Sequence, residues 1–350
     1  MFDVAQLSYL RTLIYSPSIR ITMDAKMLSL FSYPFPTLKN PFADTLQEIT
    51  DNQWIDGEYL WLYKDDPVTR QKYKKTKTAH IASQWFPTTN QERLKPICRF
   101  MLWTLFNDDK YEEGSPEQIS FIHQQSIAVL KGEISAAGSN IPLGGLLASL
   151  REELLQFISE ESLQRFIMGL SRYFRGLELE LEYKMKRTFP SVEECIAIRE
   201  DSLCLYPFLE LTDLETGIPL PAGINEHPVL QRLRALAVRM MVYFNEVQSV
   251  VKDEATDSIY YNVVKAIQYN KNLSLEEACL EDLRIHNEEL QEFLRLQHSL
   301  PDFGEWQDAV VNRVHYISMT LSGWKSVSSR LERYNSLQGF PSAQVMKKTV

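Results

Sequence analysis

The sequence has few of the residues that define disulfide-bonded, zinc-binding or β-rich proteins. Its four cysteines, in a chain of 350 residues, stand apart without a Cys-x-x-Cys spacing, which argues against a zinc site or a disulfide framework. Glycine is scarce, with 13 residues, and the alternation of β-branched and polar residues that marks strands is almost absent. These absences leave helices as the expected structure.

The chain also lacks an excess of positive charge and a long uninterrupted apolar run. Its net charge of −9 argues against a nucleic-acid partner, which needs a basic surface. Three arginines interrupt the most apolar long stretch, residues 228–251, so no membrane span is expected. The N-terminus lacks the apolar core and cleavage site of a signal peptide. We therefore expect a cytoplasmic protein.

Apolar residues recur at helical spacing along most of the chain. The pattern predicts helices over 91–107, 116–132, 144–187 (one helix or two), 191–205, 227–253, 255–270, 274–299 and 303–336. Ser191 and Ser274 each precede a glutamate by three residues, which is the capping-box pattern of a helix start. No repeat or linker interrupts the series, so we expect an all-α fold, a single bundle of about ten helices.

An acidic cluster ends the predicted helix 91–107. It contains Asp108, Asp109, Glu112 and Glu113. At helical spacing the first and third of these share a face, as do the second and fourth, so their charges repel by a few tenths of a kcal/mol. A bound Mg²⁺ would turn this repulsion into attraction, because Mg²⁺ takes carboxylate and phosphate oxygens as ligands. Taken alone, the cluster is more often a solvated helix end.

A second group of oxygen-bearing side chains lies in the predicted helix 227–253. Asn245, Ser249 and Asp253 stand at i, i+4 and i+8 and form one stripe of that helix, with Lys252 beside it. Such a stripe is also the usual polar face of an amphipathic helix. Two helices that each carry oxygen ligands suit metal ions bridging a diphosphate inside a bundle. The pair therefore predicts a metal site more strongly than either member alone.

Together these segments resemble the bacterial class I terpene synthases. Asp108, Asp109 and Glu112 or Glu113 resemble the family's aspartate-rich motif, DDxx(x)(D/E). The segment Asn-Glu-Val-Gln-Ser-Val-Val-Lys-Asp, residues 245–253, resembles its Asn-Ser-Glu triad, NDxxSxxxE. Asp253 stands where the family has glutamate, so Glu254 is an alternative third ligand. The resemblance implies three Mg²⁺ ions held by these residues.

Two further segments extend the resemblance, which covers residues 31–334. Residues 190–199 resemble the stretch that ends in the diphosphate-sensing arginine, which assigns that role to Arg199. Leu203 or Cys204 then falls at the family's effector position. Residues 323–334 resemble the C-terminal Arg-Tyr motif. By this resemblance Arg199, Lys252, Arg333 and Tyr334 bind the substrate diphosphate.

The resemblance implies a helical bundle around an apolar active-site cavity, in which a linear prenyl diphosphate is ionised and its carbocation cyclised. Farnesyl diphosphate is the favoured substrate and geranylgeranyl diphosphate the second, giving a hydrocarbon or an alcohol. Aromatic rings stabilise a cation, and Phe86, Trp103, Phe106 and Tyr243 are the candidates for this cavity wall. The enzyme is expected to be a monomer or a homodimer.

Two other functions remain open on the sequence. A prenyl-chain elongating transferase is also helical and magnesium-dependent, but carries two DDxxD motifs. A non-catalytic helical scaffold predicts that Asp108 and Asn245 lie far apart and that no cavity joins them. We expect a catalytic domain over residues 31–336, between an N-terminal extension, 1–30, whose start is Met1 or Met23, and a C-terminal tail, 337–350.

Overall fold

The structure, a computed structural model, describes residues 26–63, 66–111, 114–255, 258–331 and 333. Every regular element within these ranges is a helix. In chain order they are α3 (Ala43–Ile49), η1 (Thr50–Glu58), η2 (Leu60–Tyr63), α4 (Pro67–Thr76), α5 (Thr78–Trp85), α6 (Gln91–Tyr111), α7 (Pro116–Lys131), η3 (Ala137–Ser139), α8 (Gly144–Leu154), α9 (Glu160–Lys186), α10 (Val192–Ser202), α11 (Leu205–Glu210), α12 (Thr212–Thr216), α13 (Ala222–Asn225), α14 (Pro228–Ala255), η4 (Ile259–Tyr261), α15 (Val263–Lys271), α16 (Leu275–His298), η5 (Gly304–Trp306) and α17 (Gln307–Ser328). The all-α fold is confirmed.

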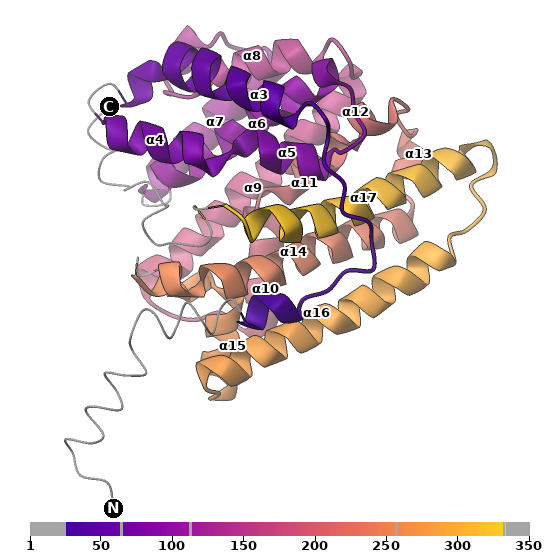
Figure 1. Cartoon of the computed structure of the whole chain (residues 1–350). Helices are drawn as coiled ribbons and strands as arrows, with labels where there is room; N and C mark the ends of the chain where they lie inside the picture. Colours follow the sequence, from indigo (N-terminus) through magenta and orange to yellow (C-terminus); the bar gives the residue numbers. More distant parts are fainter. Residues whose placement is uncertain (1–25, 64–65, 112–113, 256–257, 332, 334–350) are drawn as a thin grey trace, which may run out of the picture.

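Long helices carry the core of the bundle (Figure 1). On α14, Leu233, Leu236 and Met240 recur at helical spacing and have no exposed surface. Burying each such side chain contributes about 1.5–3 kcal/mol. Helices α9 and α14 also pack against α10, and α14 packs against α16 and α17. The long helices therefore surround a shared interior. The stripe of oxygen-bearing side chains on α14 starts within this interior.

The predicted capping boxes start two of the helices. The Ser191 hydroxyl accepts a hydrogen bond from the Glu194 backbone N–H, and α10 begins at the next residue. Ser274 does the same for Glu277 at the start of α16. Each cap satisfies a backbone donor that the helix leaves without an intrahelical partner. Both predicted starts are confirmed.

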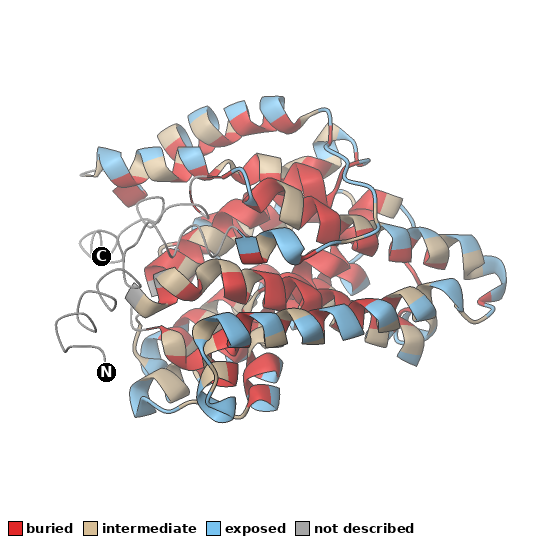
Figure 2. Cartoon of the chain, turned by 60° about the horizontal axis from the view of Figure 1, so that its bottom comes forward, coloured by how far each residue is buried: buried red, intermediate tan, exposed pale blue. Residues whose placement is uncertain are grey.

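The chain before α3 crosses the bundle from α16 to the opposite layer (Figure 1). Phe31 is buried there and packs edge-on against His286 of α16 and Phe244 of α14. Figure 2 shows the outer face of α16 exposed and its inner face buried. Met27 is also buried, so packing against the bundle begins before residue 31, where the catalytic domain was expected to start. Residues 1–25 and 334–350, which hold the rest of the expected extension and the tail, lie outside the described residues.

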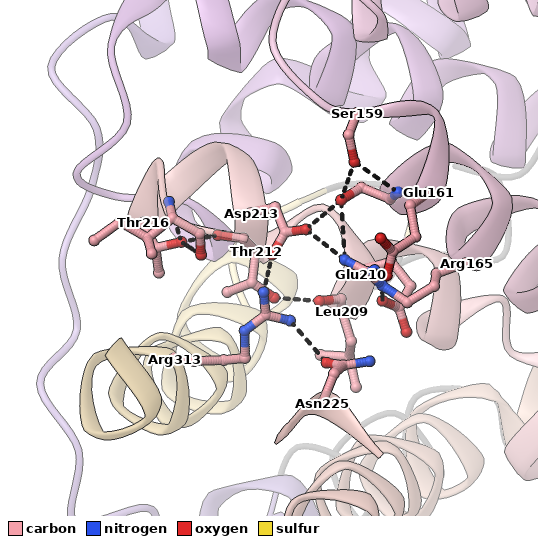
Figure 3. A network of polar contacts seen from close by, with 12 residues as sticks. Ser159, Glu161, Arg165, Leu209, Glu210, Thr212, Asp213, Thr216, Asn225 and Arg313 are labelled. Atoms are coloured by element: carbon pink, nitrogen blue, oxygen red, sulfur yellow. Dashed lines mark hydrogen bonds and ion pairs between the residues drawn. The ribbon is translucent and has the colours of Figure 1, made fainter. Parts of the chain in front are cut away.

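A buried polar network holds the short helices α11 and α12 against the long ones (Figure 3). Asp213 of α12 accepts a hydrogen bond from Arg165 of α9 at 2.9 Å and forms an ion pair with Arg313 of α17. Glu210 of α11 forms a second ion pair with Arg165, at 3.3 Å. Removing one partner of a buried ion pair typically costs about 3–5 kcal/mol. The network therefore fixes the position of α11, which forms part of the cavity wall described below.

The bundle has more helices than the ten expected. Helices α11, α12 and α13 have six, five and four residues, which is too short for helical periodicity to show in the sequence. The expected helix 144–187 is two helices, α8 and α9, and the expected helix 255–270 begins only at Val263. Within the described ranges, none of the helices is long and apolar enough to cross a membrane.

Candidate functional site

Helix α6 brings the acidic cluster to a cavity. Met101, Thr104, Leu105 and Asp108 line this cavity, at the spacings of three, four and seven that share one helix face. The helix runs on to Tyr111, four residues further than expected from the sequence, so Asp108 lies in its last turn. Asp108 is half-buried. Glu112 and Glu113, the other expected ligands of this cluster, lie outside the described residues.

Asp109 occupies a different environment from Asp108. It is not among the cavity-lining residues, and its carboxylate accepts two hydrogen bonds from Arg333, at 2.8 and 3.0 Å. The Tyr73 hydroxyl donates a third, at 2.7 Å. In this structure the oxygens of Asp109 therefore hold Arg333, and its assignment as a metal ligand stays a prediction that requires this pairing to open.

The oxygen-bearing stripe of α14 lines the same cavity. Asn245, Ser249 and Asp253 all belong to the cavity wall, and the Ser249 hydroxyl donates a hydrogen bond to Asp253 at 2.7 Å. Glu254, the alternative third ligand, is not part of the wall and forms an ion pair with Lys265 at 3.0 Å. The geometry thus favours Asp253 over Glu254. The Lys252 side chain lies outside the described residues.

Asn262, at the start of α15, contacts two members of this stripe. The sequence alone did not indicate it as part of the site. Its amide donates hydrogen bonds to the Asp253 carboxylate at 2.9 Å and to the Ser249 hydroxyl at 3.3 Å. Its side-chain oxygen caps α15 by accepting a hydrogen bond from the Lys265 backbone N–H. The residue is fully buried. An asparagine before an apolar run is an N-cap signal in a sequence, but its contacts with α14 are tertiary.

If Ser249 and Asp253 bind Mg²⁺, as the sequence predicts, Asn262→Ala should raise the Mg²⁺ concentration needed for half-maximal activity by about 10–100-fold, the usual cost of losing a residue that orients metal ligands. Loss of the cap should also lower the free energy of unfolding by about 1 kcal/mol. A Mg²⁺ titration and a urea melt measure the two effects. Ser274→Ala is the control, because it removes the cap of α16 away from the cavity and should change stability alone. An unchanged Mg²⁺ requirement in Asn262→Ala would contradict the assigned role.

Arg199 of α10 connects the two sides of the site. Its guanidinium forms ion pairs with Glu246 of α14, at 2.8 Å, and with Glu180 of α9. It also donates to Asn245 at 3.4 Å and to Ser202 at 3.0 Å. Burial opposes its charge, but the two carboxylates outweigh burial and raise the pKa of Arg199 well above its usual value. The expected sensor arginine is therefore a permanent cation on the cavity wall.

Glu246 follows Asn245 on α14 and is fully buried. Its side chain accepts hydrogen bonds from Arg199 and from the Val263 backbone N–H, at 2.9 Å each. Burial raises its pKa to about 7, against the lowering effect of Arg199. It is not part of the cavity wall. Its contacts fit a residue that positions Arg199 and the start of α15, and not a metal ligand.

The cavity has a volume of about 180 Å³ and an apolar part beside the polar one. In chain order, the cavity-lining residues of α6, α9 and α14 begin with Met101, Tyr173 and Met241. They end with Asp108, Lys184 and Asp253. Its aromatic wall includes Trp85, Phe208 and Trp324. The Trp85 ring lies edge-on to both of the others, with centroids 5.0 and 5.8 Å away.

The four aromatic residues expected on this wall are not among the lining residues. Each is buried elsewhere in the core: Phe86, Trp103, Phe106 and Tyr243. Trp103 stacks on Phe100, and Phe106 packs edge-on against Tyr73. The Tyr243 hydroxyl donates to Glu289 of α16 at 3.1 Å. This prediction is corrected, because proximity in sequence to the motifs does not place a side chain on the same face of the helix.

The donor set of the site fits Mg²⁺. Asp108, Asn245, Ser249 and Asp253 offer only oxygen, the ligand type that hard cations select. Asp108 and Asp253 also lie in the last turns of α6 and α14, where the helix dipole places partial negative charge and favours a cation. No group of three or more His, Cys, Asp or Glu side chains in the described ranges is placed to hold an ion by itself. A metal here would need the amide and hydroxyl oxygens or groups of the substrate.

Of the expected diphosphate-binding residues, the structure brings Arg199 and Arg333 to the cavity wall. Leu203 and Cys204 both line it, so either suits the effector position. Tyr334 lies outside the described residues. The scaffold alternative required that Asp108 and Asn245 lie apart with no cavity between them, whereas both line one cavity.

The chain is similar to known proteins over most of its length. The family model described as "Terpene synthase family 2, C-terminal metal binding" matches residues 99–292. The germacrene A synthase of Nostoc punctiforme is 26% identical over 289 residues, which cover 81% of this chain and 87% of the relative. The (+)-T-muurolol synthase of Roseiflexus castenholzii, named as cyclizing (2E,6E)-farnesyl diphosphate, is 27% identical over 294 residues, covering 83% of this chain and 87% of the relative.

A solved structure shows the same fold. It is the linalool/nerolidol synthase from Streptomyces clavuligerus in complex with 2-fluorogeranyl diphosphate, with a TM-score of 0.74. The sequence identity is 19%, and the match covers 87% of this chain and 99% of that one.

Proposed function

Given that the chain belongs to terpene synthase family 2, and is thus a class I terpene synthase, a lyase acting on prenyl diphosphates, we propose that it cyclises farnesyl diphosphate. The observation that carries the proposal is the shared cavity of Asp108 and the Asn245 stripe, with Arg199 beside them. Relatives support the C15 substrate, since the Roseiflexus castenholzii enzyme is named for it. Geranylgeranyl diphosphate is the second candidate.

We propose three Mg²⁺ ions as the cofactor, held by Asp108, Asn245, Ser249 and Asp253. Asp109, Glu112 and Glu113 remain candidate ligands beside Asp108. Bound ions would supply positive charge to the diphosphate as it leaves. The protein's own side chains position the ligand oxygens. Asn262 holds the start of α15 in place, and Glu246 holds Arg199 in place.

Arg199, Lys252, Arg333 and Tyr334 bind the diphosphate in this proposal. Arginine suits the task because its planar fork donates two hydrogen bonds to phosphate oxygens. Donors fixed in advance stabilise charge that develops during ionisation, which is how electrostatic catalysis lowers a barrier. The diphosphate therefore departs without a protein nucleophile.

The apolar part of the cavity receives the hydrocarbon chain. Phe208, Trp85 and Trp324 present aromatic surface to it, and an aromatic face stabilises a cation by about 0.5–2 kcal/mol. A wall of this kind also excludes water, which would quench the cation early. The contour of this wall decides the product, a hydrocarbon or an alcohol.

Incubation with Mg²⁺ and separate C10, C15, C20 and C25 prenyl diphosphates tests the proposal. We expect cyclic products by mass spectrometry and the highest kcat/KM with the C15 substrate. Chelation with EDTA should abolish turnover, and added Mg²⁺ should restore it. A higher kcat/KM with the C20 substrate would replace farnesyl with geranylgeranyl diphosphate, and full turnover in EDTA would overturn the metal assignment.

A further inference from the structure

A third cation on the cavity wall differs from the two arginines assigned above. Lys184 lies in the last turn of α9, one turn beyond Glu180, and lines the cavity. Its ammonium donates to the Ser258 hydroxyl at 3.4 Å, which is longer than the usual range of about 2.7–3.2 Å. The sequence did not single it out.

The other two cations among the described residues of the wall are neutralised by carboxylates of the protein. Arg199 pairs with Glu180 and Glu246, and Arg333 pairs with Asp109. Lys184 forms no ion pair with any side chain in the described part of the chain. An ammonium that is half-buried, and that meets only a hydroxyl among the residues the structure describes, has lost part of its hydration without an opposite charge in exchange.

We propose that Lys184 binds the diphosphate of the substrate and holds the inorganic pyrophosphate after ionisation. This inference rests on the proposed function, because that function places a diphosphate at the polar end of the cavity. A lysine ammonium has three donors and acts as a compact point charge, which suits an anion that changes position as its bond to carbon breaks. The contact would come from α9, a helix that carries no other assigned diphosphate ligand.

Lys186 provides a matched control two residues along the same helix. Its side chain is 61% exposed and pairs with Glu182, and it is not part of the cavity wall. Both lysines lie in the last turn of α9, so each interacts favourably with the negative end of the helix dipole. A difference between Lys184→Gln and Lys186→Gln therefore reports on the cavity and not on helix stability.

The test is isothermal titration of the intact protein with inorganic pyrophosphate in the presence of Mg²⁺. We expect Lys184→Gln to raise the pyrophosphate Kd about tenfold, which corresponds to about 1.4 kcal/mol, and Lys184→Arg to keep most of the affinity. Lys186→Gln should bind as the wild type does. Thermal melts check that all three variants fold.

Three results would overturn the inference: equal Kd values for wild type and Lys184→Gln, an equal loss in Lys186→Gln, or a wild-type protein that does not bind pyrophosphate. Steady-state kinetics with farnesyl diphosphate separates this inference from the proposed function. Wild-type protein that binds pyrophosphate through Lys184 but cyclises none of the four prenyl diphosphates would support the subsite and overturn the function.

Discussion

Replacing Asn245 and Ser249 together by alanine is expected to reduce terpene formation by at least about a thousandfold while leaving the protein folded. The two side chains supply oxygen to the cavity from one stripe of α14. Losing their part of the charge stabilisation at the leaving diphosphate removes several kcal/mol, and each 1.36 kcal/mol is a tenfold change in rate. Both are half-buried on the cavity wall, so their truncation leaves the packed face of α14 intact.

Gln248 provides the matched control on the same helix. It also lines the cavity, and its amide makes no hydrogen bond within the described residues. It lies outside the i, i+4, i+8 stripe, so Gln248→Ala should retain activity within about tenfold. Product is measured by mass spectrometry of the extract, and folding by circular dichroism and thermal melting. Turnover in the double variant equal to that of Gln248→Ala would contradict the proposal that the stripe binds metal.

The stripe could be predicted from sequence because its members lie on one helix. A spacing of four fixes their common face whatever the rest of the fold does. The same reasoning applies to α6, where Met101, Thr104 and Asp108 share the cavity face. Counting helical positions back from Asp108 selects Met101 and Thr104 for the cavity face and excludes Trp103 and Phe106. The aromatic prediction was wrong because it used distance along the chain and not the helical phase.

Other parts of the site depend on contacts that no local pattern encodes. Glu180 and Asn262 reach Arg199 and Asp253 from helices that meet them only in the folded bundle. The break between α10 and α11 is another case. Cys204 there has a left-handed backbone, with a φ of 59°, a conformation that glycine or asparagine adopts far more readily than cysteine. The helix predicted over 191–205 ends close to this break, but no glycine or asparagine marks the left-handed turn at Cys204.

The two neighbouring aspartates of α6 should give different phenotypes when each is replaced by asparagine. Asp108→Asn is expected to melt near the wild-type temperature but to lose nearly all activity, because it removes a cavity carboxylate proposed to bind Mg²⁺. Asp109→Asn removes the carboxylate that accepts two hydrogen bonds from Arg333 and one from Tyr73. Since this ion pair is almost fully buried, the free energy of unfolding should fall by about 3–5 kcal/mol.

Urea unfolding and Mg²⁺-dependent kinetics on both variants separate these effects. Raising the Mg²⁺ concentration should partly restore turnover in Asp108→Asn, because weakened binding of an ion is opposed by mass action. It should not restore the stability of Asp109→Asn, whose defect lies in the contact between α6 and the chain after α17. If Asp109→Asn were as stable as the wild type and regained activity with Mg²⁺, Asp109 would be a metal ligand after all, and its pairing with Arg333 would have to open when the substrate binds.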